Sequence, residues 1–191
     1  EERFSLVERV KEEGRERIRL KGEGEILEVE LFSHEYHRHP PLIFIHGLGI
    51  TERKKNFLIH SFSPLIKKGH PILFYTLPGH LSRGRGRKRH IWKMKDEEFL
   101  QFFVQSVKEI RGIMSWSGGE EFDILGISMG GMIGMITMAL DKRVRKGVFL
   151  LTGGNFEKIL WRGIMRFIIP KDCDRMTCQK LHLRYHEILD K

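Results

Sequence analysis

Cysteine is scarce in this chain of 191 residues, which contains only two. Cys173 and Cys178 are five residues apart, a spacing that matches neither a metal-binding knuckle nor a C-x-x-C redox pair, so we expect two reduced thiols. Long hydrophobic runs are also lacking, and the N-terminal residues are charged rather than apolar. From these absences we expect no membrane-spanning helix, and we expect a soluble, cytoplasmic protein that is not exported.

The overall composition of the chain predicts one globular domain. The chain is 40% hydrophobic and 31% charged. It has no internal repeat and no low-complexity tract apart from one basic run, so residues 1–191 are interpreted as a single domain. The net charge of +9 permits attraction to anionic partners but does not determine the fold.

Apolar runs and helical patterns alternate along most of the chain. Residues 1–13 are interpreted as a short amphipathic helix. The turn at 21–24 joins two predicted antiparallel strands, at 17–20 and 25–32. The continuous apolar runs at 42–45 and 71–75 predict buried strands, further apolar segments predict two more strands, and helical spacing predicts the helices between them. The predicted strands are 42–45, 71–75, 122–127 and 147–151, and the predicted helices are 51–68, 99–113 and 129–140. This order predicts an α/β fold with a doubly wound, mostly parallel sheet and an N-terminal antiparallel hairpin.

The strongest functional signal is the sequence Gly-Ile-Ser-Met-Gly at 126–130. This G-x-S-x-G pattern places Ser128 on a sharp turn between a predicted strand and a predicted helix, with its hydroxyl exposed. Because the helix must turn back close beside the strand, the positions two before and two after the serine need small residues. Gly126 and Gly130 meet that requirement.

Two further motifs also end predicted strands. His-Gly-Leu-Gly occupies 46–49, and Leu-Pro-Gly-His occupies 77–80. Together with Gly126 to Gly131, GISMGG, these motifs resemble the α/β-hydrolase superfamily, in particular its esterases and dienelactone hydrolases. The resemblance extends from the first hairpin to the strand at 147–151, with one departure, because Leu81 stands where the family has the last glycine of P-G-H-G.

The resemblance implies a role for each motif. Ser128 is implied to be the nucleophile, and the backbone N–H groups of Leu48 and Met129 are implied to form the oxyanion hole. His46 is implied to brace the oxyanion loop and His80 to shape the turn after its strand. The supporting glycines are Gly47, Gly49, Gly126 and Gly130. In a parallel sheet these strand ends share one edge, so His46, His80 and Ser128 are expected at one crevice. No metal ion or cofactor is required.

A serine nucleophile also needs a base, and the family order is serine, then acid, then histidine. No second pair of buried strands follows Gly154, so the chain is interpreted as truncated after a lid-like helical segment at 155–191. His182 and His186 follow the serine, and Glu157 is a local acid, but their spacing is more typical of a helix surface. The triad acid and histidine are therefore left unassigned, and neither His46 nor His80 is favoured as the base.

The sequence thus predicts a serine hydrolase that acts on small carboxylic esters or thioesters through acylation of Ser128. An alternative is a non-catalytic or truncated hydrolase fragment that lacks the triad acid and histidine. A weaker alternative is a basic module associated with nucleic acid, because Arg83 to Lys95 hold seven Arg or Lys residues and no acid. A solvated loop is the preferred interpretation of that run, so a nucleic-acid partner is not expected.

Overall fold

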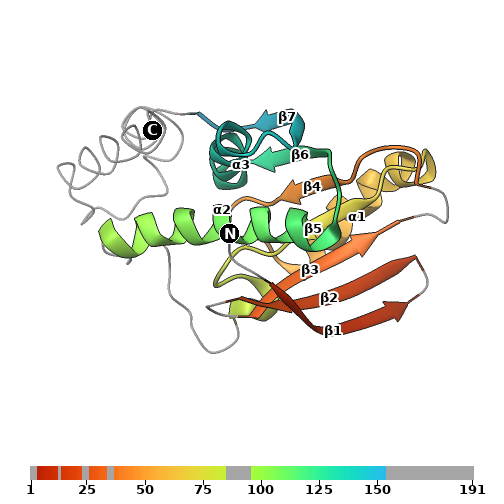
Figure 1. Cartoon of the computed structure of the whole chain (residues 1–191), viewed down its shortest axis with the longest axis horizontal. Coiled ribbons are helices and arrows are strands. Elements are labelled where there is room, and N and C mark those ends of the chain that lie inside the picture. The colour runs from red at the N-terminus through yellow and green to blue at the C-terminus, as the bar shows by residue number, and fades with distance from the viewer. Residues whose placement is uncertain (1–3, 13, 23–25, 34–36, 85–95, 154–191) are drawn as a thin grey trace.

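The computed structural model of the chain describes residues 4–12, 14–22, 26–33, 37–84 and 96–153. These residues form a seven-stranded mixed sheet in the order β1-β2-β3-β5-β4-β6-β7 (Figure 1). The strands are β1 Ser5–Glu12, β2 Arg15–Lys21, β3 Ile26–Phe32, β4 Leu42–Ile45, β5 Ile72–Tyr75, β6 Phe122–Ile127 and β7 Val144–Leu150. The helices are α1 Glu52–Lys67, α2 Asp96–Ser117, α3 Met129–Leu140 and the short 3-10 helix η1 Leu81–Gly84.

The second half of the sheet is parallel, as its continuous apolar runs predict. Strand β4 lies between β5 and β6 and pairs in parallel with both, and β6 pairs in parallel with β7. The residues of β5 and most of those of β4 are buried, so these strands are covered on both faces. Because the strands run the same way, their carboxyl ends lie along one edge of the sheet.

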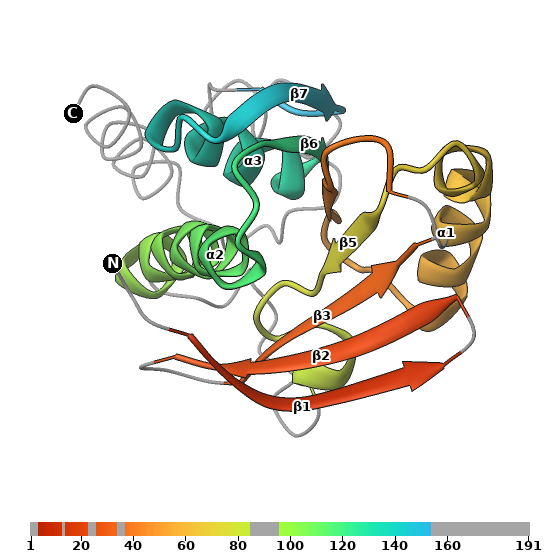
Figure 2. The same cartoon turned by 45° about the vertical axis from the view of Figure 1, so that its right-hand side comes forward.

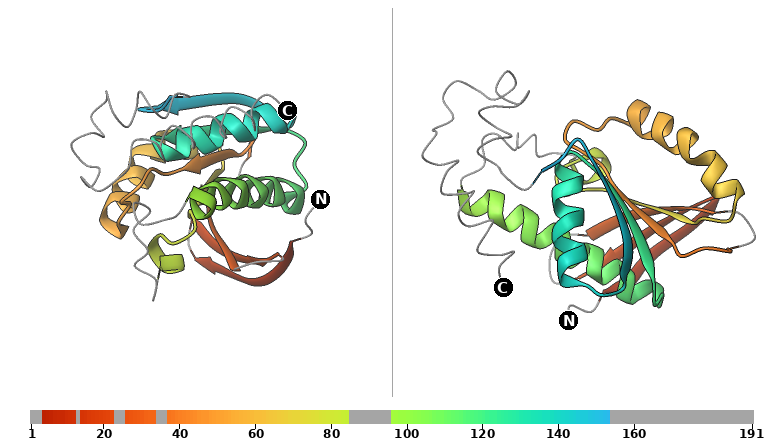
Figure 3. Two further views of the ribbon diagram at one scale, coloured as in Figure 1. Left: turned by 90° about the vertical axis from the view of Figure 1, so that its left-hand side faces the viewer. Right: turned by 90° about the horizontal axis from the view of Figure 1, so that it is seen from above.

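Helices cover both faces of the sheet, which confirms the doubly wound architecture. Helix α1 packs on one face against Phe44 and Phe74. Helices α2 and α3 pack on the other face, where Ile110 and Ile133 belong to the larger core. The view from above shows α1 on one side of the strands and α3 on the other (Figure 3).

The prediction of a helix at 1–13 is wrong, because Ser5–Glu12 form strand β1. This strand pairs antiparallel with β2 at the free edge of the sheet, so three antiparallel strands open the chain (Figure 2). Every residue of β1 is exposed. An edge strand with little burial on either face has no reason to show the period-two alternation by which strands are identified, and charged residues on such an edge also oppose pairing with other chains.

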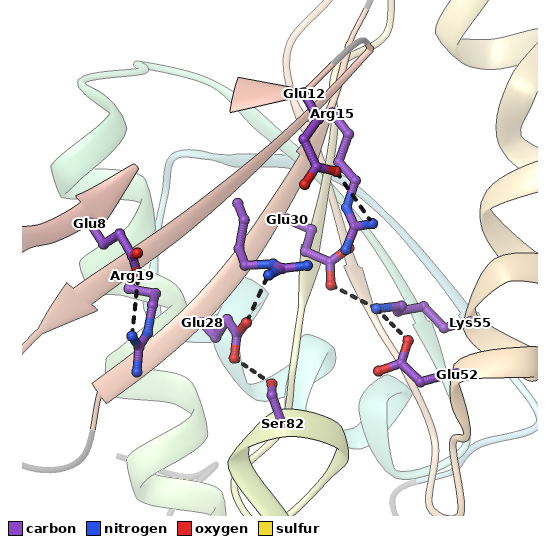
Figure 4. Close-up of polar contacts among 10 residues, drawn as sticks. Glu8, Glu12, Arg15, Arg19, Glu28, Glu30, Glu52, Lys55 and Ser82 are labelled. Atoms are coloured by element: carbon purple, nitrogen blue, oxygen red, sulfur yellow. Dashed lines mark hydrogen bonds and ion pairs between the residues drawn. The ribbon is translucent and has the colours of Figure 1, made fainter. Parts of the chain in front are cut away.

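Ion pairs on the polar face of the antiparallel strands connect them to helix α1 (Figure 4). The Nζ atom of Lys55 in α1 lies 2.7 Å from an Oε atom of Glu30 in β3 and 2.8 Å from one of Glu52. Arg15 in β2 also pairs with Glu30, at 2.7 Å. The side chains of Lys55 and Glu30 are only 5% and 6% exposed. This buried pair therefore fixes the first turn of α1 against the antiparallel half of the sheet.

Several sequence predictions fall outside the described residues. They concern the basic run from position 85 to 95, the lid-like segment at 155–191, the two cysteines, and the candidate partners Glu157, His182 and His186. Within the described ranges, no helix is both long enough and apolar enough to cross a membrane, and no cluster of three or more His, Cys, Asp or Glu residues is arranged to hold a metal ion.

Candidate functional site

Ser128 lies at the turn between β6 and α3 with an unusual backbone conformation. Its φ is +55° and its ψ is −120°, which is a strained combination for any residue with a side chain. The backbone N–H of Ser128 donates to the carbonyl of Leu150 at 2.8 Å, and its carbonyl accepts from the N–H of Gly131 at 2.9 Å. The end of β7 and the first turn of α3 thus hold the strained residue in place, while the residue itself stays partly exposed.

Close backbone contacts explain why glycine stands on both sides of the serine. A Cβ atom at Gly126 would overlap the carbonyl of Gly130 and lie 2.6 Å from the Cα atom of Gly131. A Cβ atom at Gly130 would overlap the carbonyl of Ile45 and lie 2.6 Å from the carbonyl oxygen of His46. Helix α3 therefore begins in direct contact with β6 and with the end of β4.

The loop after β4 lies directly beside the serine. A Cβ atom at Gly47 would be 3.1 Å from Ser128 Cβ and 3.7 Å from Ser128 Oγ. Leu48 follows and is partly buried against the larger core, and Gly49 is an exposed turn residue with φ +68°. Met129 is the first residue of α3, where backbone N–H groups have no partner within the helix and the helix dipole favours negative charge. The loop that carries Leu48 thus lies beside Ser128, and Met129 follows the serine at the start of α3.

His46 joins the ends of β4 and β5. Its side chain is buried, with Nδ1–H donating to the carbonyl of Gly47 at 2.7 Å and Nε2 accepting from the N–H of Leu77 at 3.1 Å. Burial lowers the pKa of His46 from 6.5 to about 3, so the ring is neutral at physiological pH. Because both ring nitrogens are already engaged, His46 acts as a brace between two strand ends.

His80 lies in the turn that follows β5, near His46. The centroids of the two rings are 5.1 Å apart in an edge-to-face arrangement, and Nδ1–H of His80 donates to the carbonyl of Pro78 at 3.0 Å. Burial is the main cause that lowers the pKa of His80. Leu81, which replaces the expected glycine, has φ +48°. The backbone therefore keeps the left-handed conformation that glycine adopts most easily, despite the different side chain.

A buried polar network beneath this turn was not foreseen from the sequence. Arg83 donates from Nη1 to Oε2 of Glu109 at 2.7 Å and from Nη2 to Oε1 at 2.8 Å, and Nη1 also donates to the carbonyl of Thr76 at 2.8 Å. The Tyr75 hydroxyl donates to Glu109 Oε2 at 2.6 Å. Burial, followed by the Glu109 charge, raises the pKa of Tyr75. Burial opposes the charge on Arg83, but the bonds to Glu109 outweigh it and raise the pKa.

The prediction that Arg83 belongs to a solvated basic loop is therefore wrong for this residue, whose side chain is only 3% exposed. No local pattern reveals the network, because Arg83 and Glu109 are 26 residues apart.

Thr152, just after β7, lies at the same edge of the sheet as Ser128 and has a buried Oγ1 with no hydrogen-bond partner among the described residues. Its side chain packs against Gly131, in the first turn of α3.

Comparisons with known proteins find a matching family and several solved structures with a similar fold. The model of the alpha/beta hydrolase family matches residues 42–177. Among solved structures, acetyl xylan esterase 1 from Thermoanaerobacterium sp. JW/SL YS485 is similar with a TM-score of 0.61 and 17% identity, over 98% of this chain and 68% of that one. VinJ is similar with a TM-score of 0.59 and 18% identity, over 90% of this chain and 59% of that one.

A cold-adapted esterase from an Arctic intertidal metagenomic library is also similar, with a TM-score of 0.57 and 18% identity, over 78% of this chain and 67% of that one. The hydrolase GrgF from Penicillium sp. sh18 has a TM-score of 0.56 and 19% identity, over 72% of this chain and 46% of that one. No curated protein sequence matches the chain. At these identities the likeness concerns the fold, and the matched region is between about half and two thirds of the length of the solved chains.

Proposed function

The chain belongs to the alpha/beta hydrolase family, and from this premise we propose that it is a serine hydrolase that cleaves carboxylic esters or thioesters with Ser128 as its nucleophile. The observation that carries the proposal is the strained, partly exposed Ser128 at the start of α3, with φ +55°. Backbone strain of this kind costs about 1–3 kcal/mol and persists where the surroundings enforce it, which is typical of functional sites.

In the proposed reaction, Ser128 Oγ attacks the acyl carbon and loses its proton to a base while a new C–O bond forms. The negative charge that develops on the carbonyl oxygen is stabilised by the N–H groups of Met129 and Leu48. In enzymes where one such donor has been removed, the loss is about 2.7–4 kcal/mol. The tetrahedral intermediate then expels the alcohol or thiol, which takes up a proton, and water hydrolyses the acyl-enzyme to regenerate Ser128.

The base and its acid partner are not assigned. His46 is a poor candidate, because its two ring nitrogens already bond to Gly47 and Leu77. A histidine base outside the described residues, within or beyond this sequence, would complete the mechanism. The alternative is a fragment that keeps the serine and the oxyanion loop without a base. We propose no nucleic-acid partner, because one basic run with a single aromatic residue makes a poor groove for nucleic acid; its first cation, Arg83, is buried against Glu109.

A fluorophosphonate probe tests the proposal, since it phosphonylates an activated serine. We expect labelling of the wild-type chain and none of the Ser128→Ala variant. Ser61→Ala is the matched control, because Ser61 is an exposed serine on α1 whose hydroxyl donates to the carbonyl of Phe57. It should label like the wild type. Equal labelling of wild type and Ser128→Ala would refute Ser128 as the nucleophile.

The same samples separate the two candidate functions when incubated with p-nitrophenyl acetate. A complete hydrolase releases p-nitrophenol continuously in a Ser128-dependent manner. A fragment that lacks the base gives neither labelling nor Ser128-dependent release while its folded state, measured by circular dichroism, is intact. That result would reject the catalytic proposal for this chain and favour the fragment.

A further inference from the structure

The peptide group between Thr76 and Leu77 is held from both sides. Its carbonyl accepts a hydrogen bond from Arg83 Nη1 at 2.8 Å, and its N–H donates to His46 Nε2 at 3.1 Å. A peptide unit is planar, so the directions of its C=O and N–H are not independent. The contact that fixes the carbonyl therefore also fixes the direction in which the N–H meets the histidine ring.

Arg83 is itself held rigidly in the position from which it reaches this peptide. Its guanidinium forms two parallel hydrogen bonds with Glu109 of α2, whose side chain is 0% exposed. Such a bidentate pair has a defined geometry as well as a strong attraction. Glu109 also accepts from Tyr75 at the end of β5, so helix α2 and the sheet hold the guanidinium together.

Helix η1, which contains Arg83, is also held by a contact with strand β3. The hydroxyl of Ser82 donates to the carboxylate of Glu28 in β3, and the figure shows the two side chains facing each other (Figure 4). Gly84 folds back against Gly79, where a Cβ atom would overlap the Gly79 carbonyl group. Helix η1 is therefore fixed between β3 and α2, and the turn that carries His80 cannot shift without breaking one of these contacts.

From the peptide group the contacts continue to the serine. His46 Nδ1–H donates to the carbonyl of Gly47 at 2.7 Å. Gly47 in turn lies against Ser128, with its missing Cβ position 3.1 Å from Ser128 Cβ. His46 is buried and neutral, so one ring nitrogen can only donate and the other can only accept. The two hydrogen bonds of the ring, to Gly47 and to Leu77, therefore fix its orientation.

We propose that Arg83 is a positioning residue that orients the Thr76–Leu77 peptide, and through His46 sets the oxyanion loop at Gly47 and Leu48 relative to Ser128. The inference rests on the proposed function for its effect on reactivity, but its structural part can be measured separately. Misplacement of a catalytic group by about 1 Å can cost about 100-fold in rate. Loss of Arg83 is therefore expected to slow phosphonylation of Ser128 by about 10- to 100-fold.

The test uses variants that separate positioning from stability. Arg83→Met alone leaves Glu109 buried without its charged partner, so the double variant Arg83→Met/Glu109→Gln is the main sample. Arg83→Lys keeps the charge but lacks the fork that reaches Glu109 and Thr76 together, so partial rescue is expected. Ile113→Ala is the stability control, because Ile113 is buried in the same helix α2 and is 0% exposed.

Two readouts are compared in each variant. The first is the exchange rate of the Leu77 amide hydrogen together with the ¹⁵N shift of His46 Nε2, which depends on the bond between these groups and not on catalysis. The second is the rate of fluorophosphonate labelling at Ser128. We expect the double variant to lose Leu77 protection more than other core amides do, shift His46 Nε2 and label more slowly. Ile113→Ala should lower protection of core amides in general, but leave the His46 Nε2 shift and the labelling rate unchanged.

Unchanged Leu77 and His46 signals in the double variant would overturn the proposal, as would altered signals with wild-type labelling rates. If the wild-type chain is not labelled at all, the proposed function fails for this chain. The Leu77 and His46 signals then decide the positioning claim by themselves, because a change seen with Arg83→Met/Glu109→Gln and reduced with Arg83→Lys supports it.

Discussion

Acidification should destabilise the protein through His46. A histidine in an unfolded chain gains a proton near pH 6.5, whereas burial lowers the pKa of His46 in the folded state to about 3. As the pH falls between these values, the unfolded state binds more protons, so the free energy of unfolding decreases. Each pKa unit corresponds to about 1.4 kcal/mol, so this one residue should remove about 2.5 kcal/mol between about pH 7 and about pH 4.5.

Urea denaturation of the wild type and of His46→Gln, measured at several pH values across this range, isolates that contribution. The glutamine amide does not titrate, while His80 and His70, whose pKa values are also lowered mainly by burial, are present in both proteins. The stability difference between wild type and variant should therefore shrink by about 2.5 kcal/mol on acidification, whatever its value at neutral pH. Parallel stability curves would show that His46 is accessible to protons in the folded state and would refute its role as a neutral brace.

Two further substitutions test the packing and the ion pairs by urea denaturation. Gly130→Ala should lower the free energy of unfolding by about 3 kcal/mol or more, because the methyl group meets backbone that cannot move aside. Gly49→Ala has open space but φ +68°, so it should cost about 1–2 kcal/mol. A larger loss for Gly49→Ala than for Gly130→Ala would contradict the close helix–strand contact. Lys55→Met should lower the free energy of unfolding by about 3 kcal/mol, because the buried carboxylate of Glu30 then keeps only Arg15 as a charged partner. Arg19→Met removes only an exposed pair and should cost less than about 1 kcal/mol, so equal losses would contradict the difference in burial.

The parallel half of the fold could be predicted because its signals are local. A continuous apolar run such as 42–45 is typical of a strand that is buried on both faces, between two layers of helix. The motifs that end these strands meet at one edge because parallel strands share their direction. At Leu81, where the family has glycine, the backbone has a positive φ even though leucine carries a side chain.

The features that were missed depend on contacts between distant parts of the chain. Strand β1 is exposed over its whole length, so its residues show no burial pattern that would distinguish strand from helix. Arg83 lies in a run of cations that indicates solvent exposure, and only the fold brings it to Glu109. The two partners of the proposed nucleophile were left open by the sequence, and their candidates lie outside the described residues.

The glycines around the serine differ in how a substitution could be tolerated. At Gly126 and Gly130 an added methyl group would strike main-chain atoms, which no change of side chain elsewhere can remove. At Gly134 it would strike the ring of Phe149 and a methyl group of Ile124, and shortening those side chains would make room. Second-site suppressors should therefore exist for substitutions at Gly134 and be absent for those at Gly126 and Gly130, so the most stable clones of a randomised library of this segment should keep glycine at both motif positions.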